Sequence, residues 1–162
     1  MSSKNPLRFG LIGLVVLASL AVLFYPTDEK RVRAAAEALV SAANGSEADL
    51  QRALDQYAVP GVSLNVSDPT ESLTGRAALL AAVRNANAMG AKLRLHLEAV
   101  EVSLSGNVAR LNADLVTADR PEVPELRRPR RSVALFEKRA DGFRLLSAEI
   151  GPERRDQPEA RP

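Results

Sequence analysis

Hydrophobic positions between residues 27 and 90 recur every three to four residues in three segments, which is the spacing of amphipathic helices. The first segment follows Thr27, a favourable helix cap, and opens with Asp28 and Glu29, whose charge suits a helix start. Asn44-Gly45 supplies its stop signal. A helix with one buried stripe is expected here, formed by Val32, Ala35, Ala36, Leu39, Val40 and Ala43.

Two shorter helices are expected next. Ser46 with Asp49 matches a capping box, and the helix that follows ends at Pro60-Gly61. Thr74 is expected to cap the third helix, which ends at Gly90. A short alternating strand over residues 62–66 separates these two helices.

From residue 93 the hydrophobic period changes to two, which indicates β-strands. The apolar set Leu93, Leu95 and Leu97 continues one residue out of phase as Val100, Val102 and Leu104. This slip near Ala99 predicts a β-bulge, which bends a strand and favours a concave sheet.

Three further strands are expected after the turn Ser105-Gly106-Asn107. They are Val108–Thr117, Arg131–Arg139 and Phe143–Ile150, with a proline-containing loop over Asp119–Pro129 between the first two. Residues 152–162 are rich in charge and proline and are expected to be disordered, which leaves residues 28–151 as one domain.

The last two strands show two apolar faces. Simple alternation places Val133, Leu135, Phe143 and Leu145 on one face and leaves further apolar residues on the other, namely Ala134, Phe136, Leu146 and Ile150. An antiparallel sheet usually exposes one face to water, so a second apolar face suggests a cover. We expect a homodimer that forms through the sheet.

Before this domain, the run Phe9–Tyr25 contains no charged residue. As a helix it would be about 26 Å long, close to the hydrocarbon thickness of a bilayer. We predict a single-pass transmembrane signal anchor at residues 9–25 after a short basic segment, residues 1–8, with the domain on the periplasmic or extracytoplasmic side of the inner membrane. The alternative is a signal peptide that is cleaved after Ala21.

Composition excludes several kinds of chemistry. The formal net charge of +2 is too small to imply a nucleic-acid partner, and the absence of cysteine rules out disulfides, thiolate metal sites and a cysteine nucleophile. The sequence contains no metal-ligand cluster, glycine-rich phosphate loop or serine elbow. We therefore predict no catalytic residue, no metal and no cofactor.

The order of these elements resembles the NTF2-like, cystatin-type α+β cone, which includes the SnoaL-like and ketosteroid-isomerase-like families. The resemblance covers residues 28–151. It is carried by Leu73-Thr74-Gly75-Arg76, by the phase slip at Ala99 and by Asp141-Gly142-Phe143-Arg144-Leu145, which is similar to the Gly-Trp-Arg-Ile opening of the family's last strand. It implies three helices packed on a curved antiparallel sheet. Anchored bacterial members act in envelope assembly, so an envelope protein partner is a further expectation.

Enzymes of this fold place their acids and bases inside the cone. Alternation puts the single histidine, His96, on the polar face, where we expect a solvated residue; the alternative is a general base. The polar residues expected to face inward, and to bind a ligand, are Tyr57, Glu137, Ser147 and Glu149. The alternative is that both glutamates are hydrated at strand ends and that Tyr57 is a core residue.

One dense basic cluster lies in the proline-containing loop. It consists of Arg127, Arg128, Arg130 and Arg131, and it suits a phosphate-bearing lipid headgroup or an acidic partner. The alternative is a solvated loop whose charge is offset by Glu122 and Glu125.

Two functions follow from these expectations. The first is a membrane-anchored binding module of the bacterial envelope, which binds a partner protein or a small apolar ligand. The second is a small SnoaL-like isomerase or lyase with its active site in the cone. A buried carboxylate that touches a closed cavity would favour the enzyme, whereas a cavity lined by leucines would favour the binding module.

Overall fold

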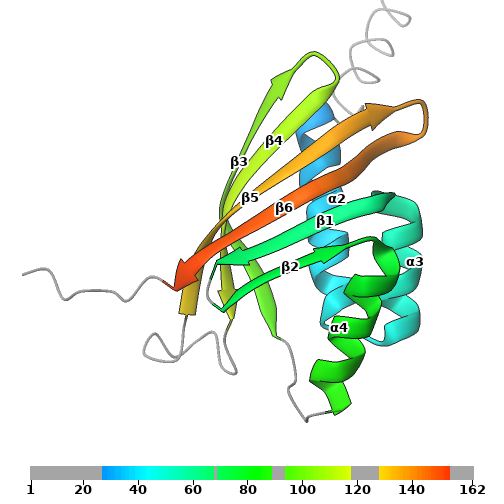
Figure 1. Cartoon of the computed structure of the whole chain (residues 1–162). Helices are drawn as coiled ribbons and strands as arrows, with labels where there is room; N and C mark the ends of the chain where they lie inside the picture. Colours follow the sequence, from blue (N-terminus) through cyan, green and yellow to red (C-terminus); the bar gives the residue numbers. More distant parts are fainter. Residues whose placement is uncertain (1–26, 68, 89–93, 118–127, 154–162) are drawn as a thin grey trace, which may run out of the picture.

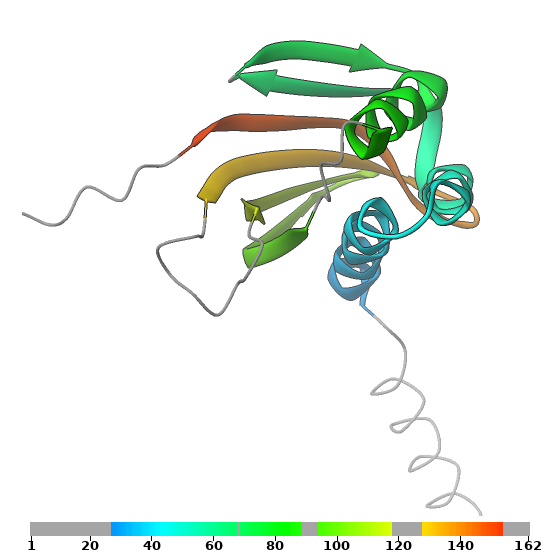
Figure 2. The same ribbon diagram turned by 90° about the horizontal axis from the view of Figure 1, so that it is seen from below.

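A computed structural model describes residues 27–67, 69–88, 94–117 and 128–153. Its six-stranded sheet has the order β2-β1-β6-β5-β4-β3. Figures 1 and 2 show a strongly curved sheet with the helices α2, α3 and α4 on its concave side. The predicted α+β architecture of three helices on a curved sheet is confirmed.

Helices α2 (Asp28–Ala43) and α3 (Glu47–Tyr57) begin where their caps predict. The Lys30 amide donates to the Thr27 hydroxyl at 3.4 Å. At α3, Ser46 and Asp49 form the full capping box. The buried residues of α2 are Val32, Ala35 and Ala36, which belong to its predicted stripe. Those of α3 are Leu50, Ala53 and Leu54.

Helix α4 (Arg76–Ala88) starts after Gly75. Thr74, the predicted cap, is instead the last residue of β2. Gly75 has φ of +88°, a conformation that glycine adopts without strain, and its amide donates to the Val62 carbonyl at 2.7 Å. The turn thereby ties the start of α4 to β1.

Strands β1 (Ala58–Ser67) and β2 (Thr70–Thr74) form an antiparallel pair, and β1 lies parallel to β6 (Gly142–Glu153). The sheet is therefore mixed, and the prediction of an antiparallel sheet is wrong for the pair β1 and β6. Strand β2 was not predicted, because a five-residue strand with Leu73 as its single hydrophobic residue gives no alternation signal.

The remaining strands, β3 (Leu95–Ser105), β4 (Val108–Thr117), β5 (Arg128–Arg139) and β6, form the predicted antiparallel series. The predicted bulge is confirmed. The register of β3 against β4 shifts between Glu98 and Glu101, and Ala99 has φ of +48°.

A second bulge, in β6, changes which residues face the helices. Phe136 pairs with Leu145, but Leu135 pairs with Ser147, so the register shifts by one residue. Strict alternation had grouped Leu145 with Leu135; instead Leu145 shares the concave face with Phe136. After the bulge, Ala148 and Ile150 take over the concave face.

Several predictions fall wholly or partly outside the described residues, among them the run 9–25, the charged tail and Arg127. Within the described ranges, no helix combines the length and apolar character needed to cross a membrane. Strand β6 continues to Glu153, two residues past the predicted domain end.

The core consists of two clusters that meet at Leu39 and Leu145. One cluster joins α2 to β4, β5 and β6 around Val32, Leu111 and Phe136. The other joins α3 and α4 to β1.

Candidate functional site: an apolar cavity in the cone

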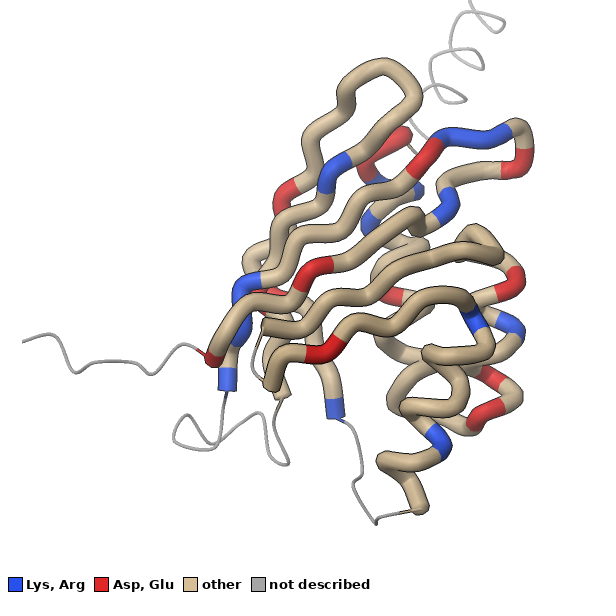
Figure 3. The backbone as a smooth tube through the Cα atoms, in the orientation of Figure 1, with Lys and Arg blue, Asp and Glu red and all other residues tan. Residues whose placement is uncertain are grey.

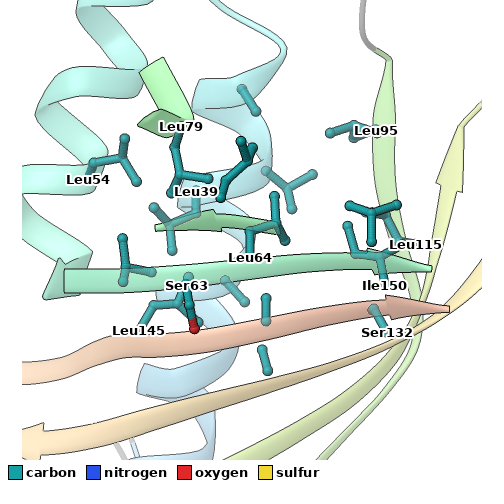
Figure 4. A pocket seen from close by; sticks show the side chains of 18 of the residues that line it. Leu39, Leu54, Ser63, Leu64, Leu79, Leu95, Leu115, Ser132, Leu145 and Ile150 are labelled. Atoms are coloured by element: carbon teal, nitrogen blue, oxygen red, sulfur yellow. The ribbon is translucent and has the colours of Figure 1, made fainter. Parts of the chain in front are cut away.

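A cavity of about 410 Å³ lies between the three helices and the concave face of the sheet. This volume falls in the range of small-molecule sites. Figure 4 shows leucines from both layers pointing into it, including Leu39, Leu54 and Leu79 from the helices and Leu64 and Leu115 from the sheet. Eleven of the lining residues are leucines.

Alternation explains how the sheet supplies its half of the lining. Leu95 and Leu97 of β3, Leu111 and Leu115 of β4 and Ala134 and Phe136 of β5 all point inward, as do Ala148 and Ile150 of β6. Helix α2 contributes residues of its predicted stripe, namely Ala36, Leu39, Val40 and Ala43. Helix α4 contributes Leu79, Ala82 and Val83.

Polar lining residues are few: Ser63, Ser132 and Glu71. Ser132 is 8% exposed, and its hydroxyl donates to the Ala113 carbonyl at 3.0 Å, so its one hydrogen-bond donor is used within the sheet. Glu71 is the single ionisable residue among the described lining residues. No Asp, His or Tyr lines the cavity within the described part of the chain.

Glu71 was not among the predicted site residues. It lies directly opposite Val66 on the neighbouring strand β1, and Val66 in turn pairs with Ile150 of β6. All three line the cavity. A sequence signal for Glu71 would have required strand β2 to be recognised first.

The four polar residues predicted to face inward do not line the cavity. Glu137 pairs with Arg144, Ser147 with Leu135 and Glu149 with Val133, which places these three on the opposite face of the sheet from Phe136 and Ala148. Ser147 and Glu149 face away from the cavity because the bulge in β6 shifts the register by one residue. A ligand-binding role for these residues stays a prediction, and it would not involve this cavity.

Tyr57 ends α3 and is half-buried against the core cluster around Val32 and Phe136. Tyr57 is thus a core residue, which was the alternative to a ligand-binding role. His96 is exposed, as expected, while its neighbours Leu95 and Leu97 point into the cavity.

The three described arginines of the cluster are part of the sheet rather than of a loop. They lie at the start of β5, where Arg128 pairs with Thr117 of β4, Arg130 with Leu115 and Arg131 with Asp114. Arg128 forms an ion pair with Glu153 at 3.4 Å. Figure 3 shows basic residues in blue and an acidic residue in red where this end of the sheet meets the grey trace.

Three surface carboxyls have a pKa below the ordinary value. A hydrogen bond from Arg84 lowers the pKa of Glu47, hydrogen bonds from Ser46 lower the pKa of Asp49, and a hydrogen bond from Arg144 lowers the pKa of Asp141. None of the three lines the cavity. Within the described ranges, no group of three potential metal ligands occurs.

Comparison with known proteins identifies the type of domain. The model of the SnoaL-like domain family matches residues 32–150. A search of curated proteins by sequence found no match.

Solved structures share the fold at low sequence identity. A Nostoc punctiforme protein with a cystatin-like fold has a TM-score of 0.62 at 12% identity, over 79% of this chain and 92% of that one. An NTF2-like protein from Novosphingobium aromaticivorans has a TM-score of 0.58 at 21% identity, over 85% and 88%. The CaMKII hub of S. rosetta has a TM-score of 0.60 at 17% identity, over 77% and 95%.

Proposed function

Because the chain belongs to the SnoaL-like domain family, we propose that it is a binding module whose cavity takes a small apolar ligand and which is anchored in the envelope membrane by residues 9–25. The observation that carries the ligand proposal is the lining. About 410 Å³ of space is bordered by aliphatic side chains from all three helices and all six strands. Transfer of an apolar molecule from water into such a space is favourable.

The same lining argues against catalysis as the main role. General acid–base chemistry needs a titratable group within hydrogen-bond reach of the reacting atom. Ser132 already donates to a backbone carbonyl, and Glu71 is exposed at the β2 edge of the sheet rather than buried. A leucine-lined cavity without a buried carboxylate is the outcome expected of a binding module.

The anchor proposal rests on sequence and on where the described domain begins. Pro26 alone separates Tyr25 from Thr27, so the domain would start within about 7 Å of the end of the apolar run. The first turn of α2 is joined to the β5–β6 hairpin by Lys138 and Asp28, whose charged atoms are 2.5 Å apart. This hairpin end of the cone would face an inner membrane, with the domain on its periplasmic side.

A second copy of the chain is the partner we propose for the outer face of the sheet, where Val133 and Leu135 are half-buried in the single chain. One structural neighbour is a hub by name, which is compatible with self-association. An envelope protein is the alternative partner for this face.

Ligand binding can be tested with a reporter that the sequence provides. The chain has two isoleucines, Ile12 in the apolar run and Ile150 in the cavity lining. In the isoleucine-methyl-labelled full chain, embedded in phosphatidylcholine nanodiscs, dodecanol is expected to shift the Ile150 signal saturably. A signal that stays unmoved up to the solubility limit of dodecanol would contradict the proposal.

The anchor can be tested by fractionation of cells that express the full chain. We expect the intact chain in the membrane fraction and the domain open to protease in spheroplasts. A chain recovered in solution with its N-terminus at Val22 would contradict the anchor and would leave the ligand proposal untouched.

A further inference from the structure

Glu71 is the one described residue that brings a charge to the cavity lining, and its position gives the cavity a polarity. Strand β2 is an edge strand of the sheet, so Glu71 lies at the border of the apolar space rather than at its centre. Within the described part of the chain, its carboxylate has no hydrogen bond or ion pair. A carboxylate left without an internal partner beside aliphatic side chains remains available to a ligand.

We propose that the cavity selects amphiphiles with a cationic head, the apolar tail lying among the leucines and the head against Glu71. This rests on the proposed function, because it presupposes that an apolar tail enters the cavity. Val66 and Ile150 continue the row from Glu71 across β1 and β6, so a tail that leaves the carboxylate meets apolar side chains at once.

The cationic side chains at this end of the sheet lie on the far side of the cavity. Arg130 pairs with Leu115, a lining residue, so it shares the concave face. Strand β5 is three strand intervals from β2, about 14 Å away. Arg128, also in β5, is paired with Glu153. A head at Glu71 is thus too distant to be repelled strongly by these arginines.

The test uses three amphiphiles with the same tail and different heads: dodecylamine, dodecanoate and dodecanol. Each is titrated, below its micelle concentration, against the isoleucine-methyl-labelled full chain in phosphatidylcholine nanodiscs, and the Ile150 signal is followed. Ile150 suits this purpose because it lies two strands from Glu71 in the same row. Partition into the bilayer is the same for all variants, so differences between variants report on the cavity.

We expect the wild-type chain to bind dodecylamine about fivefold more tightly than dodecanoate, the size expected of a partly exposed ion pair. Glu71→Gln should remove this preference and leave dodecanol unchanged. The matched control is Glu149→Gln, an exposed glutamate on the opposite face of β6, which should retain the preference.

Two results would overturn the proposal while dodecanol still binds. One is equal or tighter binding of dodecanoate by the wild-type chain, which would point to Arg128 and Arg130 as the head site. The other is a preference that survives in Glu71→Gln. If none of the three amphiphiles moves the Ile150 signal, the binding function fails together with its specificity. An unchanged Ile150 signal in the ligand-free variants confirms that each is folded.

Discussion

Ala134 of β5 and Ala148 of β6 lie directly opposite each other, and both line the cavity. Side chains that pair across strands are about 5 Å apart, so two alanines in this place leave the sheet side of the cavity open. Larger apolar residues would suit the strands at least as well and would fill the space.

The substitution Ala148→Leu is therefore expected to reduce the cavity without unfolding the domain. Binding of dodecanol, followed through the Ile150 signal, should weaken by at least tenfold, because the new side chain takes the place of the ligand. The midpoint of urea unfolding should stay the same or rise, since the added methyl groups enter existing space.

Ser147→Leu is the matched control for this prediction. Ser147 is adjacent in β6 but pairs with Leu135 on the other face of the sheet, so the same added volume falls outside the cavity. Equal loss of binding in both variants would show that the ligand does not occupy the space between the helices and the sheet.

Phe136 is the largest fully buried side chain of the core, at 1% exposed, and it packs with Val32 and Ala36 of α2. Phe136→Ala should lower the free energy of unfolding by about 3–5 kcal/mol, because it removes apolar contacts and enlarges a space that already exists. Urea unfolding followed by far-UV circular dichroism measures this change. A loss below about 1 kcal/mol would mean that α2 does not pack on β5 as described.

Some elements could be predicted because their local signals are complete. Ser46 and Asp49 carry both halves of a capping box, and the helix starts there. The bulge at Ala99 was visible because clear alternation of apolar and polar residues precedes and follows it, so a change of phase can be seen.

The bulge in β6 could not be predicted in the same way. Leu145 and Leu146 are both apolar, and a shift between two leucines leaves no mark in the pattern. This single residue reversed the faces of Ser147 and Glu149. Glu71 was missed for a different reason: its strand is held by pairing with β1, a tertiary contact that outweighs its own weak β signal.

The conformation of Ala99 predicts that a glycine at this position stabilises the domain. Its φ of +48° costs a residue with a Cβ atom about 1–2 kcal/mol, and glycine would remove this cost. Part of the resulting stabilisation is lost, because glycine has greater conformational freedom in the unfolded chain. We expect Ala99→Gly to raise the free energy of unfolding by about 0.5–1 kcal/mol. Urea unfolding of the variant and the wild type measures the difference.

The matched control is the reverse change at the β3–β4 turn. Gly106 has φ of +57°, and a Cβ atom there would meet no atom within 4 Å, so Gly106→Ala tests conformation without a steric clash. Gly106→Ala should lower the free energy of unfolding by about 1 kcal/mol. If Ala99→Gly proves as destabilising as Gly106→Ala, the bulge does not hold Ala99 in the left-handed region.

The acid stability of the domain should depend on the carboxyl of Asp49. Hydrogen bonds from Ser46 lower its pKa in the folded chain, so the unfolded chain binds the proton more readily. The contribution to stability is then fully present above the ordinary pKa of an aspartate, near 4, and is lost as the pH falls through the lowered value. Urea midpoints measured from pH 6 down to pH 3 should decline more steeply for the wild-type chain than for Asp49→Asn. Ser46→Ala should make this decline of the urea midpoint at acid pH less steep, because it removes the largest cause of the lowered pKa of Asp49. Parallel curves for all three proteins would show that the capping box does not form in solution.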